Sequence, residues 1–496
     1  MIKNLIKHSS IYSIGELSKI AIAFLLLPIY TRFLIPEEYG ILELITILGS
    51  IFSIFFSLSM YSGFQKTYLY DSNTKKEKKE ALSTALMFVI TNSVIMFSIA
   101  FLFSKDITLL IFGDIGNQYF VKLVFLVTLF QTFTVIPQSF MIAENKSKLF
   151  VIISLIQTII NMSLNIFFVA YLKKGIEGIL FGNLITMALI GSVLTIWLFN
   201  KAGFVVNLKW LKTMLSFSFP MVFSYLASFI LTMSDRFILN MFSSLTQLGL
   251  YGLGYKIGMI LNIAIVSPFM GAYSPFCFTT AKEKGHKEIF SRVFLYTAIV
   301  MTIAALSLAL FSKDILRIAT TPEYFEAYKV VIYVTLSYAI YCTTAVLASG
   351  INITGKTIYA SLTVILAAII NIILNFILIP KYGMIGAAIA TLISYFMQWV
   401  FIYTFSQRLY NIPYPIFKVL FLFISSFFIY VVGESLLNYN VFINAILCLL
   451  AISLYICICY LFLDGQMKEK TRTILISIFI HKNIGFKYRD VLDFFR

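Results

Sequence analysis

The sequence has little charge. Only 12% of its 496 residues are Asp, Glu, Lys or Arg, 60% are hydrophobic, and the mean hydropathy is +0.92. A water-soluble domain of this size needs more polar surface than this composition provides. Apolar runs of about 20 residues, the length of a bilayer-spanning helix, recur along the whole chain. The sequence therefore predicts an all-α polytopic membrane protein. We attribute the net charge of +16 to membrane topology and expect no nucleic-acid partner.

Cysteine and histidine are also scarce, with five and three residues respectively. The cysteines lie in or beside apolar segments, and neither residue type has the spacing of a disulfide framework or a zinc site. Catalytic patterns such as H-E-x-x-H and G-x-S-x-G are missing, and no polar stretch is long enough for a large extramembrane domain. We therefore expect no metal, no cofactor and no enzymatic activity.

One nucleotide-binding pattern does occur, at Gly350 to Thr357. The run G-I-N-I-T-G-K-T matches the phosphate-binding pattern G-x-x-x-x-G-K-T letter by letter. That motif works between a buried strand and a helix of an α/β domain, whereas here it lies in a short loop between two apolar spans. The sequence predicts a helix boundary with Lys356 facing the cytoplasm, and no nucleotide site.

The hydropathy pattern predicts about fourteen membrane-spanning helices with short connections. The predicted spans are residues 9–30, 41–61, 82–104, 118–142, 149–170, 176–198, 213–234, 246–270, 292–311, 328–350, 358–379, 384–405, 415–433 and 441–463. Lys and Arg concentrate in alternate connections, for example Lys75, Lys76, Lys78 and Lys79, and in the C-terminal tail. Because such residues favour the cytoplasmic side, the pattern predicts that both termini are cytoplasmic.

The chain contains an internal repeat of six spans. K-K-G-I-E-G at 173–178 matches K-Y-G-M-I-G at 381–386. T-R-F-L before E-E-Y-G matches D-R-F-I-L before T-Q-L-G, which pairs Arg32 with Arg236. Several such matches in the same order favour a true duplication over coincidence.

The repeat divides the chain into four predicted parts. They are an N-lobe at 1–205, a C-lobe at 206–410, two further helices at 411–463 and a basic cytoplasmic tail at 464–496. An even number of spans preserves orientation, so the two pseudo-symmetric six-helix lobes should be related by an axis along the membrane normal. Transporters built in this way hold their substrate near the interface of the repeats.

Polar and charged side chains interrupt spans 1, 2, 7 and 8, which form two equivalent pairs. An ionisable group at the bilayer centre costs roughly 2.5–3.5 kcal/mol, so such groups normally face a bundle interior or a watery cavity. The pattern predicts a polar path lined by these spans. The alternative is a structural Asp–Arg pair at a helix end and a lysine that reaches the interface. The residues are Glu16, Lys19, Glu43, Tyr61, Ser224, Ser228, Thr232, Asp235, Arg236 and Lys256.

Three stretches carry a family resemblance. They are Gly15–Gly40, Ser234–Gly258 with S-D-R-F-I-L-N and L-G-L-Y-G-L-G-Y-K-I-G, and Asn371–Thr391. In them the chain resembles the polysaccharide-unit flippases of the multidrug/oligosaccharidyl-lipid/polysaccharide exporter superfamily, which translocate O-antigen and capsule repeat units. The resemblance covers spans 1 to 12.

The resemblance implies a bundle of twelve core helices plus two, with a central cavity lined by helices 1, 2, 7 and 8. It also implies a cargo, undecaprenyl-diphosphate-linked oligosaccharide, that crosses the cytoplasmic (inner) membrane to the outer leaflet. Membrane lipid, a polysaccharide polymerase and chain-length proteins are the further partners that it implies.

For that cargo we expect the cations to meet the diphosphate, because charge-assisted hydrogen bonds to phosphate oxygens are strong. These cations are Lys19, Arg32, Arg236 and Lys256. Lys256 is the foremost candidate, since its equivalent in the first repeat is the apolar Ile47 and its charge is not part of the repeated scaffold.

The hydroxyl and carboxylate groups receive different expected roles. Three hydroxyl-bearing residues would meet the sugar hydroxyls, namely Tyr61, Ser224 and Ser228. Three carboxylates would balance the cations or carry a coupling proton, namely Glu16, Glu43 and Asp235. Two alternatives remain open: a cation-coupled multidrug exporter of the same superfamily, and a membrane glycosyltransferase or polymerase.

Overall fold

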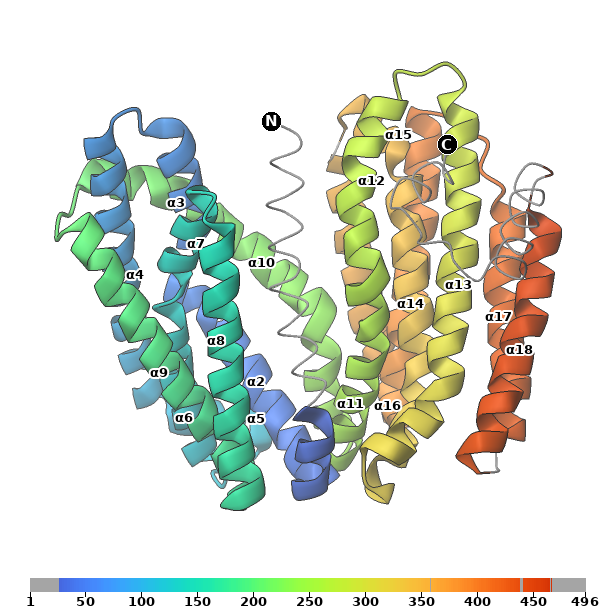
Figure 1. Cartoon of the computed structure of the whole chain (residues 1–496), viewed down its shortest axis with the longest axis horizontal. Coiled ribbons are helices and arrows are strands. Elements are labelled where there is room, and N and C mark those ends of the chain that lie inside the picture. The colour runs from blue at the N-terminus through green and yellow to red at the C-terminus, as the bar shows by residue number, and fades with distance from the viewer. Residues whose placement is uncertain (1–25, 357, 438–439, 464, 466–496) are drawn as a thin grey trace, which may run out of the picture. The chain divides into compact units, whose positions relative to one another are not determined.

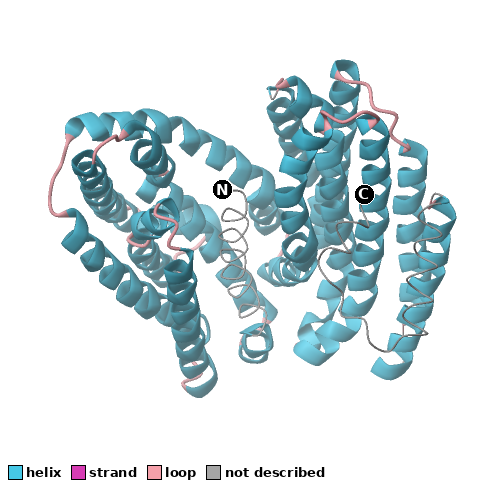
Figure 2. Cartoon of the chain, turned by 45° about the horizontal axis from the view of Figure 1, so that its top comes forward, coloured by secondary structure: helices cyan, strands magenta, loops and turns pink. Residues whose placement is uncertain are grey.

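The computed structural model describes residues 26–356, 358–437, 440–463 and 465. Over these residues the chain forms helices joined by short loops and contains no strand, which confirms the predicted all-α class (Figure 2). Eleven helices of the described part are long and apolar enough to cross a membrane. Most of the first predicted span, 9–30, lies outside the described residues.

The helices follow the predicted order along the chain (Figure 1). Their bounds are α2 (Pro36–Ser57), α3 (Met60–Lys66), η1 (Thr67–Asp71), α4 (Lys75–Leu102), α5 (Ser104–Phe112), α6 (Gln118–Thr132), α7 (Val135–Ala143), α8 (Ser147–Asn165), η2 (Ile166–Tyr171), α9 (Gly175–Ala202), α10 (Leu208–Phe242), α11 (Leu245–Leu261), η3 (Asn262–Val266), α12 (Ser267–Thr280), α13 (His286–Ala319), η4 (Pro322–Ala327), α14 (Tyr328–Leu347), α15 (Ser349–Thr354), α16 (Ile358–Leu409), α17 (Ile416–Leu436) and α18 (Val441–Phe462).

Helix α16 contains two predicted spans, 358–379 and 384–405, and bends between them at Gly383. Gly383 has a φ of 53°, and a Cβ there would lie 1.9 Å from Oε1 of Gln247. The same oxygen accepts a hydrogen bond from the backbone N–H of Met384 at 3.0 Å. Its repeat equivalent, Gly175, also has a positive φ of 52°. Matched glycines therefore turn the chain at equivalent places, as the repeat predicts.

Backbone contacts group the chain into two compact units. The first contains the described residues up to Gly252, with 319–326 and 372–387, and the second contains the remainder. In the first unit α6 packs on α2 and α9, and α10 packs on α2, α3 and α4. In the second unit α12 packs on α14, and α17 lies beside α18. The predicted lobes at 1–205 and 206–410 stay a prediction.

The predicted helix at 41–61 is wrong in one respect, because it is broken near its end. Leu58 and Ser59 have φ values of 45° and 51°, a left-handed conformation that costs a non-glycine residue roughly 1–2 kcal/mol. Asn92 of α4 donates hydrogen bonds to the carbonyls of Phe55 and Phe56, at 3.0 and 2.7 Å. The side-chain amide thus satisfies backbone groups at the end of α2, where the helix gives way to the break.

Candidate functional site

Helices α2 and α11 touch through glycine. A Cβ on Gly40 would lie 2.1 Å from the carbonyl oxygen of Leu245, and a Cβ on Gly249 would lie 1.9 Å from that of Pro36. The contact is reciprocal, because Gly40 and Gly249 are equivalent in the repeat, and so are Pro36 and Leu245. The local two-fold axis of the repeat therefore passes between these helices. The glycines let the two backbones approach closely enough to bring their side chains together.

The two-fold relation fails three residues further on, at Glu43 and Gly252. These residues are also repeat equivalents, but one is a carboxylate and the other has no side chain. A Cβ on Gly252 would lie 3.0 Å from Cδ of Glu43. The carboxylate of Glu43 therefore uses the space that a side chain at position 252 would need.

A buried charge cluster forms at this point, from Glu43 of α2, Asp235 and Arg236 of α10, and Tyr251 of α11. Arg236 is 2% exposed, Asp235 4% and Glu43 8%. The Arg236 guanidinium donates from Nη1 to Oδ1 of Asp235 at 2.9 Å, and its Nε lies 3.5 Å from Oε1 of Glu43. Buried charges are tolerated when they are paired, and here Arg236 is hydrogen-bonded to Asp235 and ion-paired with Glu43.

Tyr251 completes the cluster and was not predicted. Its side chain is fully buried, and its hydroxyl donates a hydrogen bond to Oδ2 of Asp235. Its ring lies 5.3 Å from the guanidinium carbon of Arg236, which is a cation–π distance. An apolar run rich in Gly and Tyr gives no sign of this role, because the role depends on the α2–α11 crossing. Asp235 is thereby held by both a cation and a phenol.

Arg32, the repeat equivalent of Arg236, has a different environment. It is exposed near the end of the helical segment that precedes α2. Its neighbour in the chain is Thr31, the repeat equivalent of Asp235, and the repeat equivalent of Glu43 is Gly252; neither carries a charge. No carboxylate among the described residues lies within ion-pair distance of Arg32. The same residue type in the same repeated motif is therefore buried and paired in one copy, and exposed in the other.

A pocket of about 390 Å³ lies next to the break in α2. Most of its wall consists of hydroxyl groups and aromatic rings from α2, the break, α3 and α10, and Ile54 of α2 and Val135 of α7 complete it. The residues with hydroxyls or rings are Ser53, Ser57, Ser59, Tyr61, Tyr225, Phe229 and Thr232. We call it the hydroxyl pocket. The hydroxyl of Tyr61 donates a hydrogen bond to that of Tyr225, and their ring centroids are 5.9 Å apart. Tyr61 and Thr232 were predicted to face a polar path, whereas Tyr225 and Phe229 were missed.

The remaining predicted site residues divide into two groups. Lys256 belongs to the second unit and is exposed on α11, one turn after Gly252. Glu16 and Lys19, and the side chains of Ser224 and Ser228, lie outside the described part of the structure. Their roles stay predictions.

Other polar and glycine residues have structural roles. Asn161 of α8 donates to Oδ1 of Asn183 on α9 at 2.8 Å, an interhelical hydrogen bond within the first unit. A Cβ on Gly254 would lie 2.4 Å from the carbonyl oxygen of Ala327, so this glycine serves close packing. Gly350 is buried in the short helix α15, so the nucleotide-like motif is a helix boundary without a preceding strand.

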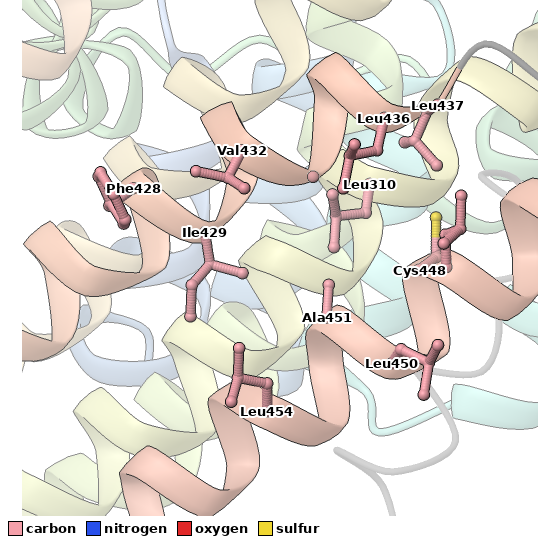
Figure 3. A pocket seen from close by; sticks show the side chains of 12 residues that line it. Leu310, Phe428, Ile429, Val432, Leu436, Leu437, Cys448, Leu450, Ala451 and Leu454 are labelled. Atoms are coloured by element: carbon pink, nitrogen blue, oxygen red, sulfur yellow. The ribbon is translucent and has the colours of Figure 1, made fainter.

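An apolar pocket of about 290 Å³ lies in the second unit, between α13, α17 and α18 (Figure 3). Its wall is aliphatic and aromatic, with Leu310, Ile429 and Leu454 among the lining residues and the sulfur of Cys448 beside them. Nothing in such a wall can orient a sugar or a phosphate, because polar ligands need polar partners. The hydroxyl pocket and the charge cluster are therefore the candidate site.

Comparison with known proteins gives a consistent result. A family model described as "Polysaccharide biosynthesis protein" matches residues 5–281, more than half of the chain. The chain is 24% identical over 425 residues to Lsg locus putative protein 1 of Haemophilus influenzae, covering 79% of this chain and 97% of that protein. It is 27% identical over 218 residues to an uncharacterized membrane protein of Methanocaldococcus jannaschii, and spans 42% of the length of each.

Two solved structures share the fold. The lipid II flippase MurJ, in an inward closed conformation, aligns with a TM-score of 0.71 at 18% identity, over 90% of this chain and 98% of that chain. An inward-facing multidrug resistance MATE family transporter of the MOP superfamily aligns with a TM-score of 0.64 at 12% identity, over 80% of this chain and 97% of that chain. These matches confirm the predicted fold class.

Proposed function

Because this chain belongs to the polysaccharide biosynthesis protein family, we propose that it is a flippase for undecaprenyl-diphosphate-linked oligosaccharide, the precursor of an O-antigen or capsule. It would work by alternating access in the cytoplasmic (inner) membrane, with both termini in the cytoplasm. A polysaccharide polymerase and chain-length proteins would use the translocated unit. The fold it shares with a lipid II flippase supports this proposal.

The observation that carries the proposal is the hydroxyl pocket. Sugars are bound through hydrogen bonds to their hydroxyl groups and through aromatic rings that cover their apolar faces, and this pocket offers both kinds of partner. Tyr61 and Tyr225 are hydrogen-bonded to each other, so a sugar hydroxyl can replace either partner without leaving the other tyrosine hydroxyl unsatisfied. Ser224 and Ser228 remain proposed contacts on the same helix as Tyr225.

The diphosphate needs cations, and the two repeat-related arginines differ in how readily they could bind it. Arg32 is exposed and has no acidic partner among the described residues, so its guanidinium can donate hydrogen bonds to a phosphate without first breaking an ion pair. Lys19 and Lys256 stay proposed contacts for the same group. Arg236 is held by Asp235 and Glu43, so it must first lose a partner.

The charge cluster suggests how transport is coupled. A proton that binds Glu43 or Asp235 removes one negative partner of Arg236, which frees the guanidinium for phosphate oxygens. Binding of the substrate and of the coupling proton would then reinforce each other. Glu16 is a third proposed carboxylate in this exchange.

A multidrug exporter of the same superfamily is the second candidate, because buried carboxylates such as Glu43 and Asp235 also suit a cationic drug. Proteoliposomes containing either a fluorescent lipid-linked oligosaccharide or a cationic dye separate the two functions. We expect the lipid-linked sugar to move between leaflets. Transport of the dye alone would contradict the flippase, and formation of sugar–sugar bonds would indicate a polymerase or glycosyltransferase.

The hydroxyl pocket gives the sharpest variant for this assay. Replacing Tyr61→Phe and Tyr225→Phe together removes two hydroxyls and keeps both rings, which should slow translocation roughly tenfold by the loss of two hydrogen bonds. Tyr171→Phe is the matched control, because Tyr171 is 76% exposed and lies outside the pocket. Equal rates for the double variant, the control and the wild type would show that the pocket does not bind the sugar.

A further inference from the structure

A second polar pocket in the first unit shares no lining residue with the hydroxyl pocket. Its volume is about 400 Å³, and it lies where η1, α4, α7 and α9 meet. Four lysines line it, with Tyr68, Leu82, Phe140 and Glu144; the lysines are Lys75, Lys78, Lys79 and Lys201. We call it the lysine pocket. In the sequence three of these lysines are only part of a basic connection, and the fold brings Lys201 to them.

Contacts with aromatic rings and one hydrogen bond hold the residues that line the lysine pocket in place. Nζ of Lys78 lies 5.2 Å from the centroid of the Tyr68 ring, and Nζ of Lys201 lies 4.2 Å from that of Trp197. The connection after α9 is tied to α4, since the Ser83 hydroxyl donates to the carbonyl of Gly203 at 2.7 Å. The hydrogen bond holds the end of α9 beside α4, and the cation–π contacts place the ammonium groups of Lys78 and Lys201 over aromatic rings, so all four lysines line one pocket.

The nearby carboxylates have other partners. Glu144 accepts a hydrogen bond from the Tyr68 hydroxyl at 2.7 Å. Burial, together with this bond, raises the pKa of Tyr68 above its usual value, so the phenol remains a donor. Glu77 accepts from the backbone N–H groups of Asn73 and Thr74. Glu80 accepts from the Asn207 side chain at 2.8 Å.

The four lysines consequently have no ion-pair partner among the described residues. They lie beside the N-terminus of α4, a helix of 28 residues whose first turn is capped by Thr74. The N-terminus of a long helix carries a partial positive charge and attracts anions. The four lysines and this helix end therefore both attract an anion to the pocket.

We propose that the lysine pocket binds a phosphate-bearing anion. Basic pockets between membrane helices at the cytoplasmic surface suit anionic lipid headgroups, and a soluble phosphate compound has the same charge chemistry. Leu82 and Phe140 close the pocket on its inner side, where they belong to the buried core of the first unit, so the ligand would bind through its charged phosphate group. This site is additional to the proposed substrate path.

The test uses the full-length protein and two probes that separate the sources of phosphate. In one arm, lipid retention is measured by native mass spectrometry after reconstitution with equal amounts of phosphatidylglycerol and phosphatidylcholine. In the other, pyrophosphate is titrated into detergent-purified protein and binding is followed by calorimetry. The variant is Lys75→Gln with Lys79→Gln. The matched control is Lys282→Gln with Lys284→Gln, which removes two equally exposed lysines from a connection in the second unit.

We expect the wild type and the control to bind at least one of the two probes, phosphatidylglycerol or pyrophosphate. The Lys75/Lys79 variant should bind that probe at least about fivefold more weakly, since each lysine near a surface contributes roughly that factor toward anionic lipid. A response to phosphatidylglycerol identifies a lipid site, and a response to pyrophosphate identifies a soluble ligand. The proposal is overturned if the wild type binds neither probe, or if both double variants lose binding equally.

Discussion

At the scale of single residues, the informative feature is that the two arginines of one repeated motif have different environments. Arg236 is buried between two carboxylates, and Arg32 is exposed. The sequence predicts the same role for both, because T-R-F-L and D-R-F-I-L match closely. What separates them is the exchange of Glu43 for Gly252 and of Asp235 for Thr31 at equivalent positions, whose effect appears once the helices are packed.

The two arginines should therefore respond differently to the same substitution. Arg236→Gln leaves two buried carboxylates without their cation and should lower the free energy of unfolding by about 3–5 kcal/mol. Arg32→Gln should leave stability nearly unchanged and slow lipid-linked oligosaccharide transport. Thermal unfolding in detergent and the proteoliposome assay, applied to both variants, measure the contrast.

A neutral cluster provides the control for Arg236. Adding Glu43→Gln and Asp235→Asn to Arg236→Gln removes all three charges at nearly constant volume, so most of the lost stability should return. If the triple variant is as unstable as Arg236→Gln alone, packing and not charge explains the loss. If Arg32→Gln is as unstable as Arg236→Gln, the exposed position of Arg32 is contradicted.

At the scale of elements, the crossing of α2 and α11 decides which side chains meet. Gly249→Ala would place a methyl group 1.9 Å from the carbonyl oxygen of Pro36, so the helices must separate. We expect a loss of at least about 1–3 kcal/mol in the free energy of unfolding, with a lower unfolding temperature. Transport should fall as well, because Glu43 would move away from Arg236.

Gly271 supplies the matched control for this crossing. It is an exposed glycine in helix α12, and a Cβ there would meet no atom within 4 Å. Gly271→Ala should raise stability slightly, because alanine is the better helix former by roughly 1 kcal/mol. A Gly249→Ala protein as stable as Gly271→Ala would show that the two helices do not touch as described.

Most of the elements could be predicted from the sequence, because long apolar runs and glycine-marked turns are local signals. Gly383 and Gly175 turn the chain at equivalent places, as the repeat predicts, and the nucleotide-like motif at Gly350 lies at a helix boundary. The break at Leu58 and Ser59 could not be predicted, since neither residue favours a left-handed turn and the cause lies in tertiary packing. The same reason hides Tyr225 and Tyr251, whose roles exist only where helices cross.

At the scale of the whole molecule, the distribution of basic residues makes a prediction about orientation. Lys76 lies in the first turn of α4, a helix of 28 residues that is roughly 42 Å long, and Lys105 lies at the start of α5, just beyond the other end of α4. Positively charged connections favour the cytoplasm, so Lys76→Cys should react with an impermeant maleimide only from inside and Lys105→Cys only from outside. The background should carry Cys457→Ser, because Cys457 is exposed and the other four cysteines are buried.

Labelling of right-side-out and inverted membrane vesicles reads out this prediction. The reverse pattern would place the lysine pocket on the outer surface and contradict a cytoplasmic location of both termini. Labelling of both positions from one side would contradict the spanning role of α4. The Cys457→Ser protein without an added cysteine serves as the unlabelled reference.

In the reciprocal contact of Gly40 with Gly249, two equivalent segments of the repeat meet as the same segment of two identical subunits would, yet the charge cluster beside it is one that identical subunits could not build. Two copies of the first half would face each other with a glutamate from each across the axis, and two copies of the second half would offer a glycine from each. Neither two glutamates nor two glycines would neutralise one arginine and leave the other unpaired. Because the two repeats are joined in a single polypeptide and have diverged, this protein can pair one arginine with carboxylates and leave the other exposed.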